Sequence, residues 1–231
     1  MRKRPAPPTR PYHHGDLRRA LIAAALDLVT EKQDWTFSLR EVARRAGVSH
    51  NAPYSHFAEK QDLLAAVAAA GFEVLRDRMR SAVAGLEAAD AALIASGRAY
   101  VDFALENPAR YRLMFGPELA KVAGGRPAEA RAAGDEARAV LIDIIRAGAR
   151  SGVFAIPSDD PRDIEIAVLS AWSVVHGLTL LLLDNLREGT AAADDVIEGV
   201  QQTLLRGLKS APSSRASPAR RRAQGDRGRE R

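Results

Sequence analysis

The chain has 231 residues, 46% hydrophobic and only 5% aromatic, and no stretch alternates apolar and polar residues, so we predict an all-α fold and expect no sheet. Cysteine is absent, which excludes disulfides, thiolate zinc sites and cysteine nucleophiles, and no apolar segment follows the basic start, so we expect a cytoplasmic protein without a secretory signal. The net charge of +5 is unevenly distributed. Residues 1–70 hold eleven basic and seven acidic side chains, and residues 210–231 hold seven basic and two acidic ones. Between them, residues 71–209 hold sixteen basic and twenty acidic side chains.

The chain begins with a predicted flexible arm and then becomes helical. Residues 1–11 place four basic side chains among prolines, a composition that favours an extended arm. Beyond the arm, apolar residues recur at helical spacing in segments that glycine, proline and asparagine separate. Helices are expected over about 15–34, 38–46, 48–57, 60–84, 88–106, 111–115, 128–150, 162–187 and 191–208. From Ser210 this spacing is lost, so residues 210–231 are predicted to be a disordered basic tail.

These helices divide into a small and a large unit. Residues 12–60 hold the short helices and residues 61–209 the longer ones, and the helix over about 60–84 should link the two. The basic N-terminal part suits phosphate binding, whereas the acidic body would be repelled by DNA and should face away from it. A solvated surface explains each charge excess equally well when it is taken alone.

The most apolar segment, residues 166–183, contains no formal charge over eighteen residues and therefore reaches the lower length limit of a membrane span. We reject a membrane span because polar residues such as Ser173 and His176 interrupt it and no other segment is membrane-like. One apolar stripe includes Val168, and a second face includes Trp172. A helix with two such faces fits packing against its own domain on one side and against an identical subunit on the other.

The segment from Ser38 to Phe57 predicts two short helices around a sharp turn. Ser38 stands three residues before Glu41, which is the spacing of a capping box at a helix start. Gly47 readily adopts the left-handed conformation that a sharp turn needs. This arrangement is typical of a helix-turn-helix, whose second helix enters a major groove, although helical proteins that bind no DNA also contain it.

The residues of this segment closely resemble the DNA-binding domain of the tetracycline-repressor (TetR) family of bacterial transcription regulators. The resemblance covers about Tyr12–Val67. Its motifs are Leu39-Arg-Glu-Val-Ala43, Ala46-Gly-Val-Ser49, Tyr54-Ser-His-Phe57 and Glu59-Lys-Gln-Asp-Leu-Leu64. The resemblance implies a homodimer that binds palindromic double-stranded operator DNA, usually as a repressor that a small ligand releases.

The resemblance also assigns DNA contacts to individual residues. Tyr54, His56 and Lys60 match positions at which the family contacts phosphates, and all three side chains donate hydrogen bonds to phosphate. Arg40, His50, Asn51 and Ala52 match positions that can face base edges, and Ser49 belongs to the same DNA interface. Arginine suits guanine and asparagine suits adenine. The alternatives to phosphate contact are partial core packing for Tyr54, a surface position for His56 and simple solvation for Lys60.

Pro53 departs from the leucine or isoleucine that the family often has at this position. Proline lacks an amide donor, so it fits only if the second helix begins late, with Asn51 or Ala52 near its first turn. This departure leaves open which side chains reach the bases.

A second resemblance concerns the C-terminal domain type named for its Trp, His and Gly (WHG). It rests on Tyr100–Pro108, Tyr111–Phe115 and Trp172–Gly177, and it implies that the helix holding Trp172 and the last helix form the dimer. Trp172 and His176 share one helix face, where they could line a cavity for a small, largely apolar ligand. The complete candidate set is Tyr100, Phe103, Met114, Phe115, Trp172 and His176. The alternative is a core tryptophan beside a hydrogen-bonded histidine.

An enzyme is the main alternative class. None of the five histidines pairs with a carboxylate at a metal-binding spacing, and no glycine-rich phosphate loop precedes a helix, so no catalytic residue, metal or cofactor is expected. A constitutive DNA-binding regulator without an effector is harder to separate from a ligand-responsive one, because its sequence would differ little.

Overall fold

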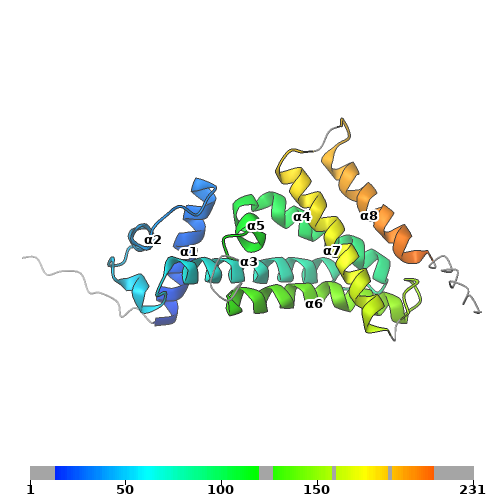
Figure 1. Ribbon diagram of the computed structural model, residues 1–231, viewed down its shortest axis with the longest axis horizontal. Helices are drawn as coiled ribbons and strands as arrows, with labels where there is room; N and C mark the ends of the chain where they lie inside the picture. Colours follow the sequence, from blue (N-terminus) through cyan, green and yellow to red (C-terminus); the bar gives the residue numbers. More distant parts are fainter. Residues whose placement is uncertain (1–13, 120–126, 158–159, 187–188, 211–231) are drawn as a thin grey trace, which may run out of the picture.

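The computed structural model describes residues 14–119, 127–157, 160–186 and 189–210. Within these ranges the chain forms eight α-helices, one short 3-10 helix and no strand, which confirms the all-α prediction (Figure 1). The predicted arm over residues 1–11, the loop over 124–127 apart from its last residue, and the tail beyond Ser210 lie outside the described residues.

The helices follow one another closely along the chain. In order they are α1 (His14–Lys32), α2 (Leu39–Arg45), the 3-10 helix η1 (Ala52–Ser55), α3 (Lys60–Val83), α4 (Ala89–Glu106), α5 (Pro108–Phe115), α6 (Ala128–Arg150), α7 (Pro161–Leu183) and α8 (Ala193–Lys209). Figure 1 shows an elongated molecule with α1 and α2 at one end and with α7 and α8 side by side toward the other.

Helix α3 is the axis of the molecule. Every residue from Leu63 to Ala69 is buried, and Phe72, Leu75 and Met79 continue the buried face. The helix packs against α1 near its start and against α4, α5 and α6 along the rest of its length (Figure 1). Because α3 belongs to both packed regions, the boundary expected between residues 60 and 61 falls at the first residue of one continuous helix.

The predicted helix over residues 48–57 is wrong in its length. Only Ala52–Ser55 is helical, as a single 3-10 turn whose first bond is the Tyr54 amide donating to the Asn51 carbonyl at 3.2 Å. Pro53 has no amide hydrogen to continue the helical bonding pattern, and proline disfavours helical geometry in the residue before it. The motif therefore has a late, short second helix after Asn51.

Two further details differ from the sequence prediction. Helix α7 ends at Leu183 rather than at Arg187, because Asn185 adopts a left-handed conformation (φ +51°) and the Leu186 amide donates to the Leu181 carbonyl, as in a Schellman cap. Helix α5 begins at Pro108 rather than at Tyr111, since proline is well suited to the first turn of a helix.

Helix α7 has an inner and an outer apolar face. Val168, Val175 and Leu178 are buried against the protomer's own core, whereas Ile166 and Leu169 are about half exposed. Among the described helices, α7 alone is long and apolar enough to cross a membrane, judged by length and composition. An outer groove between α7 and α8 is lined by Val174, Val196, Gly199, Val200, Thr203 and Leu204.

Candidate nucleic-acid interface and ligand cavity

The turn between α2 and η1 is built by a complete capping box and a glycine. The Glu41 amide donates to the Ser38 hydroxyl at 3.2 Å, and the Ser38 amide donates to the Glu41 carboxylate at 2.8 Å. That second bond and the Lys32 ammonium, 3.0 Å from the carboxylate, lower the pKa of Glu41 to about 2. Gly47 then adopts φ +69°, as predicted for the sharp turn.

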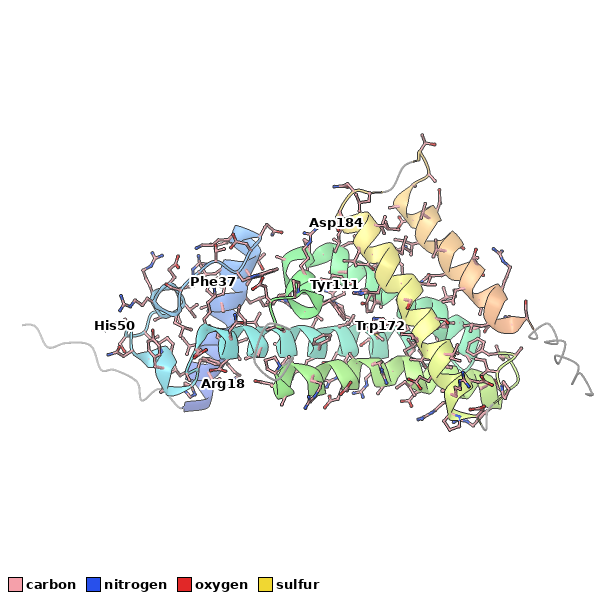
Figure 2. All side chains as sticks on the ribbon, in the orientation of Figure 1. Arg18, Phe37, His50, Tyr111, Trp172 and Asp184 are labelled. Atoms are coloured by element: carbon pink, nitrogen blue, oxygen red, sulfur yellow. The ribbon has the colours of Figure 1, made fainter. Side chains whose placement is uncertain are left out.

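Side chains after the turn divide between core and solvent. Pro53 and Phe57 are buried. Five of the predicted DNA-contact residues are exposed on or near the turn, and Ala52 is half-buried beside them; the five are Arg40, Ser49, His50, Asn51 and Tyr54. Figure 2 shows His50 at the end of the molecule farthest from Trp172. The structure therefore brings six of the eight predicted DNA-contact residues to one end of the molecule.

The two remaining predicted phosphate contacts are partly engaged within the protein. The Lys60 ammonium donates to the Trp35 carbonyl and lies 5.1 Å from the Phe37 ring centroid, and burial lowers the pKa of Lys60. His56 is half-buried and packs near Phe57, with ring centroids 6.4 Å apart. The ammonium has three N–H donors, so Lys60 can keep its bond to Trp35 and still donate to a phosphate.

Helix α2 carries three arginines in different environments. The Arg45 guanidinium donates to both carboxylate oxygens of Glu31, at 2.6 and 2.5 Å, and thereby lowers the pKa of that carboxyl. Arg40 and Arg44 are exposed and form no ion pair or hydrogen bond with a described residue. Both guanidinium groups are therefore available to DNA phosphates, and Arg44 is a candidate that the sequence comparison missed.

An ion pair connects α1 to the larger part of the molecule. The Arg18 guanidinium donates to the Glu129 carboxylate of α6 at 2.6 Å, and its carbon lies 5.5 Å from the Phe57 ring centroid. Both charged side chains are partly exposed, so this pair adds little to stability. Its position is informative, because one arginine contacts both the end of the turn motif and α6.

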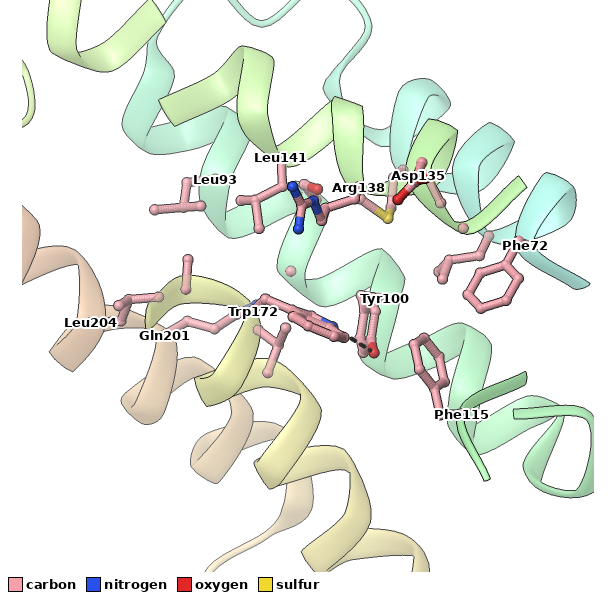
Figure 3. Close-up of a pocket in the computed structure, with 18 of the residues that line it drawn as sticks. Phe72, Leu93, Tyr100, Phe115, Asp135, Arg138, Leu141, Trp172, Gln201 and Leu204 are labelled. Carbon is pink, nitrogen blue, oxygen red and sulfur yellow. Dashed lines mark hydrogen bonds between the residues drawn. The ribbon is translucent and has the colours of Figure 1, made fainter. Parts of the chain in front are cut away.

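A cavity of about 190 Å³ lies among α3, α4, α6, α7 and α8, with one residue of α5 at its edge (Figure 3). Its walls are mostly apolar and aromatic. The lining includes the side chains of Phe72, Tyr100, Phe115, Trp172, Gln201, Arg131, Asp135 and Arg138. A largely apolar enclosure with a few polar groups is the usual form of a small-molecule site.

A hydrogen-bonded network forms one wall of this cavity. The Trp172 indole N–H donates to the Tyr100 hydroxyl at 3.4 Å, the Tyr100 and Tyr111 hydroxyls lie 3.0 Å apart, and the Tyr111 hydroxyl lies 2.6 Å from His176 Nδ1. An indole can only donate. The Tyr100 hydroxyl also lies 2.9 Å from the same nitrogen, so an unprotonated His176 Nδ1 accepts from one of the two phenols, and Trp172 is the donor at the other end of the network.

Burial keeps every member of this network neutral. It raises the pKa of Tyr100 to about 12, raises the pKa of Tyr111 further, and lowers the pKa of His176. The network joins α4, α5 and α7, because Tyr100, Tyr111 and His176 belong to those three helices. A change at the cavity wall can therefore reach α5, which also packs against α1.

The predicted ligand residues are close together, but only some of them line the cavity. Tyr100, Phe115 and Trp172 are part of its wall. His176 lies behind them, with its ring centroid 4.8 Å from that of Phe115. Phe103 and Met114 are completely buried and do not line the cavity, so their contact with a ligand remains a prediction.

Sequence reasoning missed the cavity residues on α3, α6 and α8. Phe72, Leu141 and Leu204 lie on apolar helix faces, which identify core positions but not a gap between them. Arg131 and Arg138 resemble a solvated helix surface in the sequence. In the part of the chain that the structure describes, no three histidine or acidic side chains are grouped so that they could hold a metal ion.

Comparisons with protein-family models match two parts of the chain. Residues 21–67 match the model described as bacterial regulatory proteins of the tetR family. Residues 93–204 match the model described as the tetracyclin repressor-like C-terminal domain. The first match contains the turn motif, and the second contains most of the residues that line the cavity.

Similar proteins and structures agree with these matches. A solved structure of a protein of unknown function from Rhodococcus sp. RHA1 is 34% identical, covers 87% of this chain and 100% of its own, and has a TM-score of 0.73. A tetR-family regulatory protein from Rhodococcus RHA1 shares the fold at 24% identity, covering 84% of this chain and 98% of its own, with a TM-score of 0.60. An HTH-type transcriptional regulator of Haemophilus influenzae is 36% identical over 99 residues, which span 42% of this chain and about half (48%) of that curated relative.

The buried network predicts a pH-dependent stability that depends on His176. Its pKa is lowered in the folded protein from the ordinary value of 6.5, so below that value the unfolded chain binds a proton that the folded chain does not. Folding stability should therefore fall as the pH decreases through about 6.5. We expect His176→Asn to lose less stability between about pH 7 and pH 5 than the wild type, measured by urea unfolding.

The control for this measurement is His50→Asn, because His50 is exposed on the turn. That variant should retain the wild-type dependence on pH. An unchanged dependence in His176→Asn would show that His176 does not control stability in this range.

Proposed function

Because this chain belongs to the TetR family of bacterial transcriptional regulators, we propose that it is a repressor that binds a palindromic operator as a homodimer and leaves it when a small ligand occupies the cavity. The exposed turn motif carries this proposal: Arg40, Asn51 and Tyr54 are exposed, and the motif they belong to lies with α2 at one end of the molecule (Figure 1). We place the protein in the cytoplasm and assign it no catalytic role.

The proposed DNA contacts separate into phosphate and base contacts. Tyr54 is 52% exposed, and Arg44 has no protein partner among the described residues, so both suit phosphate binding. Arg40, His50 and Asn51 are the side chains that we assign to base edges. Since η1 is short, the exposed turn before it contributes as much to this surface as the helix does.

The proposed dimer uses the outer faces of α7 and α8. Ile166, Leu169 and Leu181 are 48–54% exposed on α7, and the apolar groove between the two helices adjoins them. Large exposed apolar surfaces are uncommon on monomers and are typical of interfaces between subunits. Covering this face with its symmetry copy would account for the apolar character of α7 without a membrane.

The proposed release works through α5. Phe115 lies at the end of α5 and lines the cavity, while other parts of α5 pack against α1 and α3. A ligand that displaces Phe115 or Tyr100 would shift α5 against the DNA-binding helices. To release DNA, it must bind better to a state whose two motifs are wrongly spaced for major grooves about 34–36 Å apart.

The sequence divides, in this proposal, into a basic arm over 1–11, a DNA-binding part over 12–60, a regulatory and dimerisation part over 61–209 and a basic tail over 210–231. The WHG resemblance supports the assignment of the third part. The one alternative that we retain is a constitutive regulator without an effector, because an enclosed cavity can also be a packing defect.

The first test of the proposed function is sequence-specific, salt-dependent DNA binding to an operator selected from a random pool. The logarithm of affinity should fall with the logarithm of salt concentration, with a slope of roughly −0.9 per neutralised phosphate. Tyr54→Phe and Arg44→Ala should weaken all sequences alike, whereas Asn51→Ala should cost about 1–3 kcal/mol at particular bases. The matched control is Arg80→Ala, because Arg80 is an exposed arginine on α3; this variant should change neither the overall DNA affinity nor the base preference. Binding that ignores salt, or that does not exceed binding to competitor DNA, would contradict the proposal.

The dimer is tested by placing a charge on the outer face of α7. Leu169→Glu would bury an unpaired carboxylate in the interface, so the dimer dissociation constant should rise at least about tenfold in sedimentation experiments. Leu86→Glu, on a comparably exposed leucine after α3, should leave the dimer intact. A wild type that is monomeric at micromolar concentration would rule out this interface.

Ligand release is tested with small apolar compounds that raise the melting temperature. Compounds that bind should also lower operator affinity, and Trp172→Ala should weaken both effects at least about tenfold, because it removes a wall of the cavity. Ile142→Ala is the control, since Ile142 is a half-buried residue of α6 outside the cavity. If compounds bind but never displace DNA, the constitutive alternative is favoured.

A further inference from the structure

Two arginines and one aspartate stand at the entrance of the cavity. Arg131, Asp135 and Arg138 lie on successive turns of α6, and each is exposed to solvent although it also lines the cavity. Figure 3 shows Arg138 and Asp135 on the side of the cavity opposite Trp172, with the Arg138 guanidinium extending away from the Asp135 carboxylate. The entrance therefore has one more positive than negative charge.

Neither of these arginines is neutralised within the described part of the chain. Arg131 and Arg138 form no ion pair or hydrogen bond with a described residue. Elsewhere in the described chain, guanidinium groups beside exposed carboxylates do pair, for example Arg112 with Asp184 at 2.6 Å and Arg98 with Asp102 at 2.8 Å. Asp135 is close enough in sequence for such a pair with either arginine and forms none. The guanidinium groups thus remain available to a bound anion.

The interior of the cavity offers little to a second polar group. The Trp172 N–H is directed at the Tyr100 hydroxyl, and the Gln201 amide donates to the Ile94 carbonyl at 3.3 Å. The remaining inner walls are aliphatic and aromatic apart from the Ser96 hydroxyl. A ligand that matches this enclosure has an apolar body and a single charged group, which stays at the α6 entrance.

We propose that the effector is a small monocarboxylic acid whose apolar body fills the cavity and whose carboxylate pairs with Arg138, with Arg131 as a second cation nearby. This inference rests on the proposed function and specifies the chemistry of its ligand. An arginine fork matches a carboxylate through two parallel hydrogen bonds, and such charge-assisted bonds are among the strongest in proteins. A carboxylic acid is ionised at neutral pH, so the match needs no proton transfer.

The cavity volume limits the size of the acid. A cavity of roughly 150 Å³ holds a benzene ring, so a cavity of about 190 Å³ accommodates a ring with a short side chain, or a short alkyl chain. Aromatic walls could also attract an apolar cation through their ring faces. An ammonium group would, however, meet two guanidinium groups and only one carboxylate at the entrance, so the charges favour the acid.

The experiment compares acids with neutral and cationic analogues of the same shape. Benzoate, phenylacetate, phenylpropanoate and octanoate are each measured beside the corresponding primary amide and amine, by calorimetry and thermal stabilisation of the full chain without DNA. We expect at least one acid to bind about tenfold more tightly than its amide, with the amine weaker than both. Equal binding of the acid and the amide, stronger binding of the amine, or binding of none of the acids overturns the proposal.

Variants identify the residue that binds the carboxylate. Arg138→Gln should weaken the bound acid about tenfold and leave its amide unchanged, while Arg138→Lys should retain part of the preference. The matched control is Arg146→Gln, because Arg146 is an exposed arginine of α6 outside the cavity; this variant should change the binding of neither the acid nor the amide. Loss of acid and amide binding together, or no loss of acid binding, would reject the role of Arg138.

Operator release, measured separately, distinguishes this inference from the proposed function. If compounds other than acids bind in the cavity and release DNA, the ligand class is wrong and the proposed function stands. If acids bind with the expected preference but DNA is never released, the inferred site stands and the proposed release mechanism fails.

Discussion

Complete burial of α3 from Leu63 to Ala69 is the constraint on which the rest of the structure depends. Its unbroken run of buried residues from Leu63 to Ala69 is mostly alanine, which allows neighbouring helices to approach closely. Gly71 extends this property, since an added Cβ there would come within 2.6 Å of Met114 Sδ on α5. The start of α3 holds α1 and the turn motif, and its later residues Phe72 and Met79 line the cavity. One helix therefore carries both functional regions, and a bend or shift in it affects both.

The cavity is bordered by a neutral network that the core can maintain only when every polar group finds a partner. An unpaired buried hydroxyl or imidazole costs about 1–3 kcal/mol, so Tyr100, Tyr111 and His176 stabilise one another mainly by avoiding that cost. The same bonds join α4, α5 and α7 at the cavity wall. A ligand that alters the position of Trp172 changes the first donor in this network, and α5 is the helix through which the change would reach α1.

The arginines of the turn motif and those of the larger part of the molecule have different partners. In the turn motif Arg40 and Arg44 have no described carboxylate as partner, while many arginines of the larger part are paired, as Arg78 is with Glu106 and Arg112 with Asp184. Arg138 differs from those pairs because it stands at the cavity without a partner among the described carboxylates. Exposed ion pairs contribute little to stability, so these differences bear on binding more than on folding.

The sequence by itself determined the all-α fold, most helix bounds, the capping box of Ser38 with Glu41 and the left-handed turn at Gly47. These features depend on local periodicity and backbone preference, which a short segment contains completely. Through the family resemblance it also indicated Tyr100, Phe115 and Trp172, three residues that now line the cavity.

Only the tertiary structure decided which apolar faces meet and where they leave space. It buried Leu178 and exposed Leu169 on the same apolar helix, engaged Lys60 with Trp35, and placed Arg138 at a cavity rather than on an ordinary solvated face. Each of these outcomes depends on contacts between residues far apart in the chain. Helical spacing specifies which side chains share a face, but the partner of that face is set by how whole helices pack.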